Sequence, residues 1–242
     1  MRHSDARDYD PRVSHHLDVV FIDVGGPLYD DRPYYRSILN ALREMGASMS
    51  DEAYAREYER CRQAQDGSFR RRLAHAFLGP DADVRELTAR AAQHWRYSAA
   101  SLHEDVRGCL EILAPAYRLG VIANQLASVR DAMRRDGIDH YFTVWAVSEE
   151  LGVEKPDPRI FAYGIERAGV APERTAMVGD RLDYDVIPAR RARMHAVWIL
   201  RGEAPSHPTD QQLLLADAAI HTLRELPGAL QRIGPSGTGE VG

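Results

Sequence analysis

Short apolar runs alternate with amphipathic helical segments along most of this chain, and no other feature of the sequence constrains the fold as strongly. The apolar runs predict six strands, at residues 17–22, 119–123, 143–147, 175–178, 196–200 and 218–220. Strands that are separated by helices pair in parallel, because each helix carries the chain back to the edge of the sheet where the previous strand began. We therefore expect an α/β fold with a parallel sheet.

The interval between the first two predicted strands is too long for a single crossover. From residue 33 to about 100 the pattern is helical only, with Tyr54, Tyr58 and Cys61 at helical spacing and turn signals at 66–67 and 78–80. We interpret 33–100 as a helical domain that is inserted into a core domain. The core domain then consists of residues 15–32 and 101–232, and the ends, 1–14 and 233–242, are expected to be flexible tails.

Composition excludes several classes of function. The 242 residues can bury a full core, and 44% hydrophobic with 28% charged residues is ordinary for a water-soluble protein. A formal net charge of −5 without a run of like charges argues against nucleic-acid binding. The sequence is compatible with a monomer or a homodimer.

The sequence also argues against a membrane protein. No apolar stretch approaches the ~20 residues that a membrane span needs, and residues 1–10 are too polar for a signal sequence. Cys61 and Cys109 lie far apart without metal-like spacing. We therefore expect two buried thiols in a cytoplasmic protein.

Polar residues gather where the predicted strands end. Asp23 follows the first strand and leads into a glycine-rich turn, whose backbone can approach a ligand closely. Asp180, Asp183 and Asp185 follow the fourth strand within six residues, although Asp183 could equally cap a helix. Because open parallel sheets bind ligands at the carboxyl ends of their strands, these carboxylates should lie together. Oxygen-rich clusters of this kind suit Mg²⁺.

The chain contains one lysine. All the other residues among its 31 lysines and arginines are arginine, whereas Lys155 stands in Val-Glu-Lys-Pro-Asp-Pro at 153–158. A compact ammonium on a flexible stem does different work from a planar guanidinium. The single lysine is therefore a candidate for a site that requires a point charge, close to the carboxylates.

These features together resemble the haloacid dehalogenase-like hydrolase superfamily. The most specific match is the stretch 148–161, which contains the lysine, followed by Met-Val-Gly-Asp-Arg-Leu-Asp-Tyr-Asp at 177–185. The resemblance extends from residue 17 to about 224. It implies a Rossmann-like parallel-sheet core, with 33–100 as the family's small helical cap that closes over the substrate and selects it.

The resemblance also implies roles for individual residues. Asp23 would be the nucleophile that takes up a phosphoryl or acyl group. Lys155 would steady the charge that this nucleophile shares with the substrate. Mg²⁺ would be held by Asp23, Asp180 and the backbone carbonyl of Gly25, while Asp185 would support the metal site or Lys155. The expected enzyme is a phosphatase or phosphoryl-transfer enzyme that acts on a small phosphorylated metabolite.

Three positions depart from the pattern of the family's phosphatases. The second aspartate, which protonates the leaving group and then activates water, is Gly25 here, and a threonine two residues later is Pro27. The Ser or Thr that binds the transferred phosphoryl group is Ala123. We still expect Ala123, with Asn124 and Lys155, to meet the substrate.

The missing aspartate leaves the source of protons open. Loss of a general acid or base typically lowers a rate about 10²- to 10⁴-fold. The substrate, the cap, or a nearby residue such as Tyr29, Asp30 or Gln125 could supply the proton transfer. Two alternatives remain, a hydrolase of a different bond and an inactive relative that binds a ligand or a protein.

Some features of the sequence bear on these alternatives. The family's dehalogenases usually lack the Gly-Asp pair that is present here at 179–180, and its phosphonate-cleaving members use a cap lysine, which 33–100 does not contain. Both reactions are therefore disfavoured. In the cap, Arg70-Arg71-Arg72 could bind an anionic substrate or form a solvated helix face, and the pair at 34–35 could line the substrate cleft or pack between cap and core.

Overall fold

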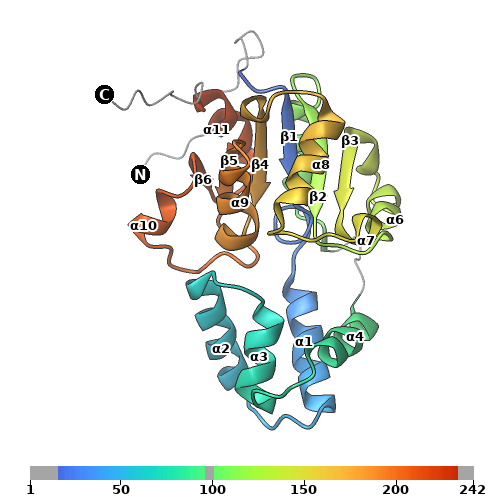
Figure 1. Cartoon of the computed structure of the whole chain (residues 1–242), viewed down its shortest axis with the longest axis vertical. Coiled ribbons are helices and arrows are strands. Elements are labelled where there is room, and N and C mark those ends of the chain that lie inside the picture. The colour runs from blue at the N-terminus through green and yellow to red at the C-terminus, as the bar shows by residue number, and fades with distance from the viewer. Residues whose placement is uncertain (1–15, 96–100, 234–242) are drawn as a thin grey trace.

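A parallel sheet of six strands forms the centre of the molecule (Figure 1). The computed structural model describes residues 16–95 and 101–233, and the strand order is β3-β2-β1-β4-β5-β6. The strands are β1 (Val19–Ile22), β2 (Arg118–Ala123), β3 (Phe142–Val147), β4 (Thr175–Gly179), β5 (His195–Ile199) and β6 (Ala218–Ile220). The predicted α/β fold is confirmed, and the ends of the six strands shift by no more than two residues.

Helices cover both faces of the sheet, so that each face has its own apolar core. On one face α5 (Val106–Leu113), α6 (Val129–Arg135) and α11 (Leu226–Arg232) enclose one hydrophobic cluster. On the other face, toward the viewer in Figure 1, α8 (Pro158–Ala168) and α9 (Ile187–Arg191) enclose another. Strands β1, β4 and β5 are buried along their whole length, which is why they read as continuous apolar runs.

Short helical elements connect these layers. A single wide turn of helix at Leu182–Val186 follows β4 and places Asp185 against Gly179 at the end of that strand. The remaining short elements are α7 (Ser148–Leu151), α10 (Asp210–Leu213) and the 3₁₀ turns Asp139–Tyr141, Pro172–Arg174 and Leu223–Glu225.

A group of four helices lies beyond the carboxyl ends of the strands (Figure 1). This group, called the helical insert below, comprises α1 (Arg32–Glu44), α2 (Asp51–Ala64), α3 (Phe69–Leu78) and α4 (Val84–His94). Ser50, Ser68 and Asp83 cap the last three helices by accepting backbone N–H bonds. The insert has a separate hydrophobic core, which includes Tyr54 and the free, buried Cys61.

The order of the strands creates a crevice beside β1. The chain runs from β1 outward to β2 and β3, and then returns to the other side of β1 to form β4. Ligands bind at such a reversal in open α/β sheets, because the loops after the two strands diverge there. Asp23 follows β1 and Asp180 follows β4, and the backbone N–H of Asp23 donates to Val178 O at 2.9 Å.

The predicted tails fall mostly outside the described residues, which exclude 1–15, 96–100 and 234–242. Ile233, which the sequence placed in a tail, is described; it is 6% exposed and packs against the core. Within residues 16–95 and 101–233, no helix combines the length and the apolar character that crossing a bilayer requires.

The tight packing of β2 against β1 generates a first prediction. A Cβ at Gly120 would lie 2.6 Å from the Phe21 ring, so Gly120→Ala should lower the free energy of unfolding by about 1–3 kcal/mol. The matched control is Gly108→Ala on α5, where a Cβ meets no atom within 4 Å and should stabilise the helix by up to ~1 kcal/mol. Urea denaturation measures both, and equal stability of the two variants would contradict this packing.

Candidate active site

Lys155 lies buried between two carboxylates. Its Nζ is 2.9 Å from Asp23 Oδ1 and 2.6 Å from Asp185 Oδ1. The other oxygen of Asp185 accepts the backbone N–H of Arg181 at 3.0 Å, so the helical turn after β4 fixes this carboxylate. The side chains of Lys155 and Asp185 are 2% and 0% exposed. Water therefore screens the three charges poorly, and each depends on the others.

Asn124 holds the backbone of this lysine. Its Nδ2 donates to Lys155 O at 2.9 Å, and its Oδ1 accepts the N–H of Lys155 at 2.6 Å. The Asn124 side chain lines the cavity described below, but both of these polar atoms are used to position the lysine. Ala123, the residue before Asn124, is fully buried and does not line the cavity.

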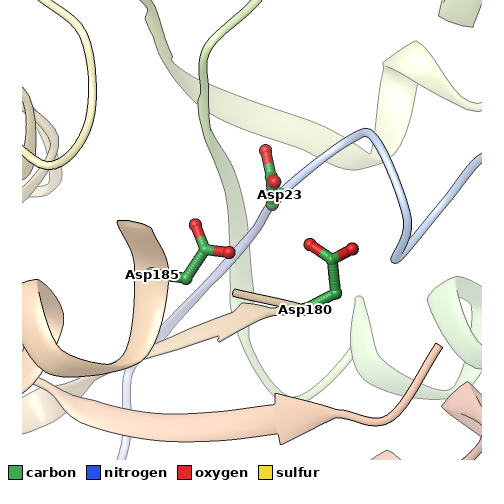
Figure 2. Close-up of side chains that lie close together, drawn as sticks. All are labelled: Asp23, Asp180 and Asp185. Carbon is green, nitrogen blue, oxygen red and sulfur yellow. The ribbon is translucent and has the colours of Figure 1, made fainter. Parts of the chain in front are cut away.

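Asp180 brings a third carboxylate to the same place. One oxygen from each of Asp23, Asp180 and Asp185 lies within 4.8 Å of the others, and the three side chains converge in Figure 2. The N–H of Glu203 donates to Asp180 Oδ2 at 2.6 Å. A Cβ at Gly26 or at Gly202 would lie 2.2 or 2.3 Å from that oxygen. Both glycines have positive φ, so the loops can approach Asp180 only because these residues have no side chain.

The positive charge of Lys155 does not fully balance the negative charges of the three carboxylates. Burial, strengthened by the charge of Asp185, raises the pKa of Asp23 to about 7 even though Lys155 opposes the shift. Burial and the neighbouring carboxylates also raise the pKa of Asp180 well above its usual value. Burial alone would lower the pKa of Lys155, yet Asp185 and Asp23 raise it. An excess of negative charge on oxygen atoms fits a hard divalent cation such as Mg²⁺.

A cavity of about 530 Å³ opens above these groups, between the sheet and the helical insert. Tyr34, Arg70 and Trp95 line it from the insert side, and Tyr34 accepts a hydrogen bond from Arg70 Nη1 at 2.8 Å. Tyr35 instead packs against the rings of Tyr54 and Tyr58. Of the aromatic pair at 34–35, Tyr34 therefore lines the cavity, whereas Tyr35 packs within the insert and not between cap and core.

The three consecutive arginines of the insert, at 70–72, have different surroundings. Arg70 reaches the cavity, Arg71 is exposed, and Arg72 pairs with Asp66 at 2.7 Å. One cation of this run is therefore available to the cavity, which Lys155 also lines.

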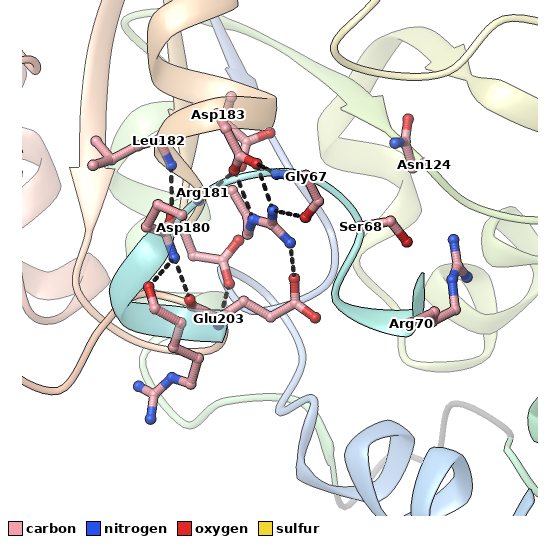
Figure 3. Close-up of polar contacts among 12 residues, drawn as sticks. Gly67, Ser68, Arg70, Asn124, Asp180, Arg181, Leu182, Asp183 and Glu203 are labelled. Atoms are coloured by element: carbon pink, nitrogen blue, oxygen red, sulfur yellow. Dashed lines mark hydrogen bonds and ion pairs between the residues drawn. The ribbon is translucent and has the colours of Figure 1, made fainter. Parts of the chain in front are cut away.

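Arg181 joins the core to the helical insert (Figure 3). Its guanidinium donates to Asp183 and Glu203 in the core and, at 2.8 Å, to the backbone carbonyl of Gly67 in the insert. The N–H of Gly67 in turn donates to Asp183 Oδ2 at 2.7 Å. Asp183 is thus an interface residue and stays out of the carboxylate cluster.

Two further contacts strengthen this junction. The guanidinium of Arg181 lies over the ring of Phe69, 3.8 Å from its centroid, and 4.4 Å from the centroid of Tyr184. Gln65 donates to Glu203 O at 2.7 Å and accepts the N–H of Leu182 at 2.8 Å. The turn between α2 and α3 is therefore attached to the core beside the cavity.

Position 25, where a carboxylate is absent, has an acidic neighbour. A Cβ at Gly25 would lie 3.0 Å and 3.2 Å from the two carboxylate oxygens of Asp31. Asp31 precedes α1 and lines the cavity. Burial raises the pKa of Asp31 well above its usual value, and the charges of Glu203 and Asp23 add to this shift.

The three residues that the sequence suggested as proton sources are not placed to serve the cavity as acids or bases. The hydroxyl of Tyr29 is in the core and donates to Asp136 at 2.9 Å, while Asp30 pairs with Arg32; neither residue lines the cavity. Gln125 lines it, but an amide does not titrate. Sequence reasoning missed Asp31 because an aspartate before a helix normally indicates a cap.

Sequence reasoning also missed the junction residues Gln65 and Glu203. Gln65 contacts Glu203 and Leu182 over more than 100 residues of chain, and no local pattern marks such pairs.

Comparisons with known proteins identify a family and several relatives of this chain. The family described as haloacid dehalogenase-like hydrolase matches residues 17–193. A glyceraldehyde 3-phosphate phosphatase from Methanopyrus kandleri is 42% identical over 95 residues, which are 39% of this chain and 41% of that protein. A phosphoserine phosphatase from Thermus thermophilus is 41% identical over 119 residues, 47% of this chain and 46% of that protein. The chain thus matches less than half the length of these two relatives.

A solved structure extends the likeness in fold to most of the chain. A predicted phosphoglycolate phosphatase from Haemophilus somnus superposes with a TM-score of 0.71 at 19% identity. The superposition covers 88% of this chain and 98% of that one. It supports the fold, including the presence of helices beside the sheet.

The buried ion cluster generates a second prediction. Lys155→Met should lower the free energy of unfolding by about 3–5 kcal/mol, because the fully buried Asp185 loses its cation. Adding Asp185→Asn should recover part of this loss, since an amide carries no charge and its oxygen can still accept the N–H of Arg181. Denaturation in a buffer with a metal chelator measures both variants. A double variant no more stable than the single one would argue against the pairing.

Proposed function

The chain belongs to the haloacid dehalogenase-like hydrolase family, and on that premise we propose that it is a Mg²⁺-dependent phosphatase acting through Asp23 on a small phosphorylated metabolite. One constellation carries the proposal: Lys155 contacts Asp23 at the carboxyl end of the central strand, and Asp180 is close enough to share a cation with Asp23. The two curated relatives, which are named as phosphatases of small molecules, support the same reaction class.

Asp23 supplies the nucleophilic oxygen. A carboxylate that approaches a phosphate ester meets a like charge, and in a site that is partly closed to water this repulsion is large. Lys155 reduces it, because its ammonium contacts Asp23 at 2.9 Å and Asp185 holds the ammonium in place. Transfer of the phosphoryl group gives an aspartyl-phosphate, which water then hydrolyses.

Asp23, Asp180 and the carbonyl of Gly25 would hold the metal ion. The approach of an oxygen of Asp23 to an oxygen of Asp180 within 4.8 Å supports this assignment. Burial is the main cause of the raised pKa values of both groups, and the charge of neighbouring carboxylates adds to it. Asp185 is engaged by Lys155 and by the backbone of Arg181, so its role is to fix the lysine. Bound Mg²⁺ would neutralise charge on the transferring phosphoryl group.

The helical insert would act as a cap over the substrate. It lines the cavity above Asp23, and the contacts of Arg181 and Gln65 attach it to the core. A closed cap keeps bulk water away while the ester is cleaved. The cation of Arg70 and the ring of Trp95 give the cavity a polar and an apolar wall, which would bind the part of the substrate beyond its phosphate.

The third prediction concerns the reaction itself. Phosphate release from a panel of phosphomonoesters should require Mg²⁺ and should vanish in Asp23→Asn. Asp180→Asn should need more Mg²⁺ for the same rate, because it removes one charged ligand. Full activity of Asp23→Asn would rule out nucleophilic catalysis by this residue. A wild-type protein that is silent over the whole panel would favour a different scissile bond or an inactive ligand-binding relative.

The fourth prediction concerns the wall of the cavity. For a substrate with a second anionic group, Arg70→Ala should raise KM about tenfold or more with little change in kcat, because an ion pair away from the reacting bond is lost. Arg71→Ala, one residue away and exposed, is the matched control and should behave as wild type. Identical KM values for the two variants would remove Arg70 from the substrate site.

A further inference from the structure

The proposed reaction needs two proton transfers that Gly25 cannot perform. When a phosphoryl group passes to Asp23, the oxygen of the leaving alcohol gains a proton. When water then attacks the aspartyl-phosphate, it loses one. A group that serves both steps must lie beside the nucleophile, in the cavity, and have an atom that is free to donate and accept a proton.

The carboxyl group of Asp31 lies next to the point from which an aspartate side chain at position 25 would extend. Its two carboxylate oxygens are 3.0 Å and 3.2 Å from the position that a Cβ at Gly25 would take. It lines the same cavity as Asp23, Asp180 and Lys155. The space next to position 25 that a side chain there would enter is therefore occupied by a carboxyl group from six residues further along the chain.

A structural role does not account for this placement. Asp31 is the residue before the first turn of α1, yet its side chain makes no capping bond to that helix. Within residues 16–95 and 101–233, its carboxylate also takes part in no hydrogen bond or ion pair. In contrast, Asp23 and Asp185 contact Lys155, and Asp180 accepts the N–H of Glu203. The oxygens of Asp31 remain available to a ligand in the cavity.

We propose that Asp31 is the proton-transfer residue of this enzyme, in place of a carboxylate at position 25; the inference rests on the phosphatase function proposed above. In the first step the bond from Asp23 to phosphorus forms, the ester P–O bond breaks, and the leaving oxygen takes the proton of the Asp31 carboxyl group. In the second step water attacks phosphorus and gives a proton to the Asp31 carboxylate, while the bond between phosphorus and Asp23 breaks. Asp31 is thereby protonated again, as it was before the first step.

Substitution of Asp31 tests the inference, with Asp30 as the matched control. Asp30 is also acidic and adjacent, but it pairs with Arg32 and does not line the cavity. With glycerol 2-phosphate, Asp31→Asn should lower kcat about 10²- to 10⁴-fold, whereas Asp30→Asn should leave it unchanged. With 4-nitrophenyl phosphate, whose leaving group needs little protonation, phosphoryl transfer should persist and hydrolysis should lag. Intact-mass measurement of quenched Asp31→Asn should then detect the phosphorylated protein.

A variant with the carboxylate at position 25 shows whether the loss of activity in Asp31 variants comes from lost proton transfer or from damage to the structure. Gly25→Asp combined with Asp31→Ala should regain about tenfold or more over Asp31→Ala alone, because one carboxyl group again reaches the same space. Gly25→Asp by itself should bring no gain, since its Cβ would crowd the Asp31 oxygens at 3.0 Å.

The outcomes distinguish the inference from the function on which it rests. An active wild type with Asp31→Asn equal to Asp30→Asn overturns the role of Asp31 and leaves the phosphatase intact. Failure of the double variant to regain activity, with an unphosphorylated Asp31→Asn, also overturns it. A wild type that is silent toward both esters overturns the phosphatase and the inference together.

Discussion

The ammonium of Lys155, placed between Asp23 and Asp185, is the interaction on which the rest of the site depends. A buried carboxylate without a cation is strongly unfavourable, so neither aspartate could remain charged there alone. The lysine itself is held from behind by the two hydrogen bonds of Asn124. Three strand ends, those of β1, β2 and β4, are thereby joined through one charged group at the crevice of the sheet.

Glycine makes the density of carboxylates possible. Gly26 and Gly202 let two loops approach Asp180 more closely than any side chain would allow, and Gly25 leaves room for Asp31. The cost of this arrangement is electrostatic, as the raised pKa values of Asp23, Asp180 and Asp31 indicate. Packing and charge therefore oppose each other at this site, which is a common condition of catalytic centres.

The core and its carboxylates could be predicted from sequence because both follow from local patterns. Period and length identify strands, and parallel strands bring residues such as Asp23 and Asp180 to one edge. Asn124 lines the cavity, but its bonds to Lys155 depend on a loop 31 residues away, which no local pattern indicates. Asp31 was overlooked because the same residue type before a helix usually caps it. Arg181 and Gly67 are 114 residues apart, and only the folded chain brings them together.

The position of Asp31 at the start of α1 ties chemistry to architecture. Under the proposal above, the nucleophile follows β1, whereas the proton-transfer residue directly precedes α1, where the core joins the helical insert. A movement of the insert that displaced Asp31 would lengthen the distance between Asp31 and Asp23. A phosphorylated Asp23 would then not be hydrolysed until the insert returned. The proposed hydrolysis would therefore be limited to the arrangement in which the insert covers the cavity.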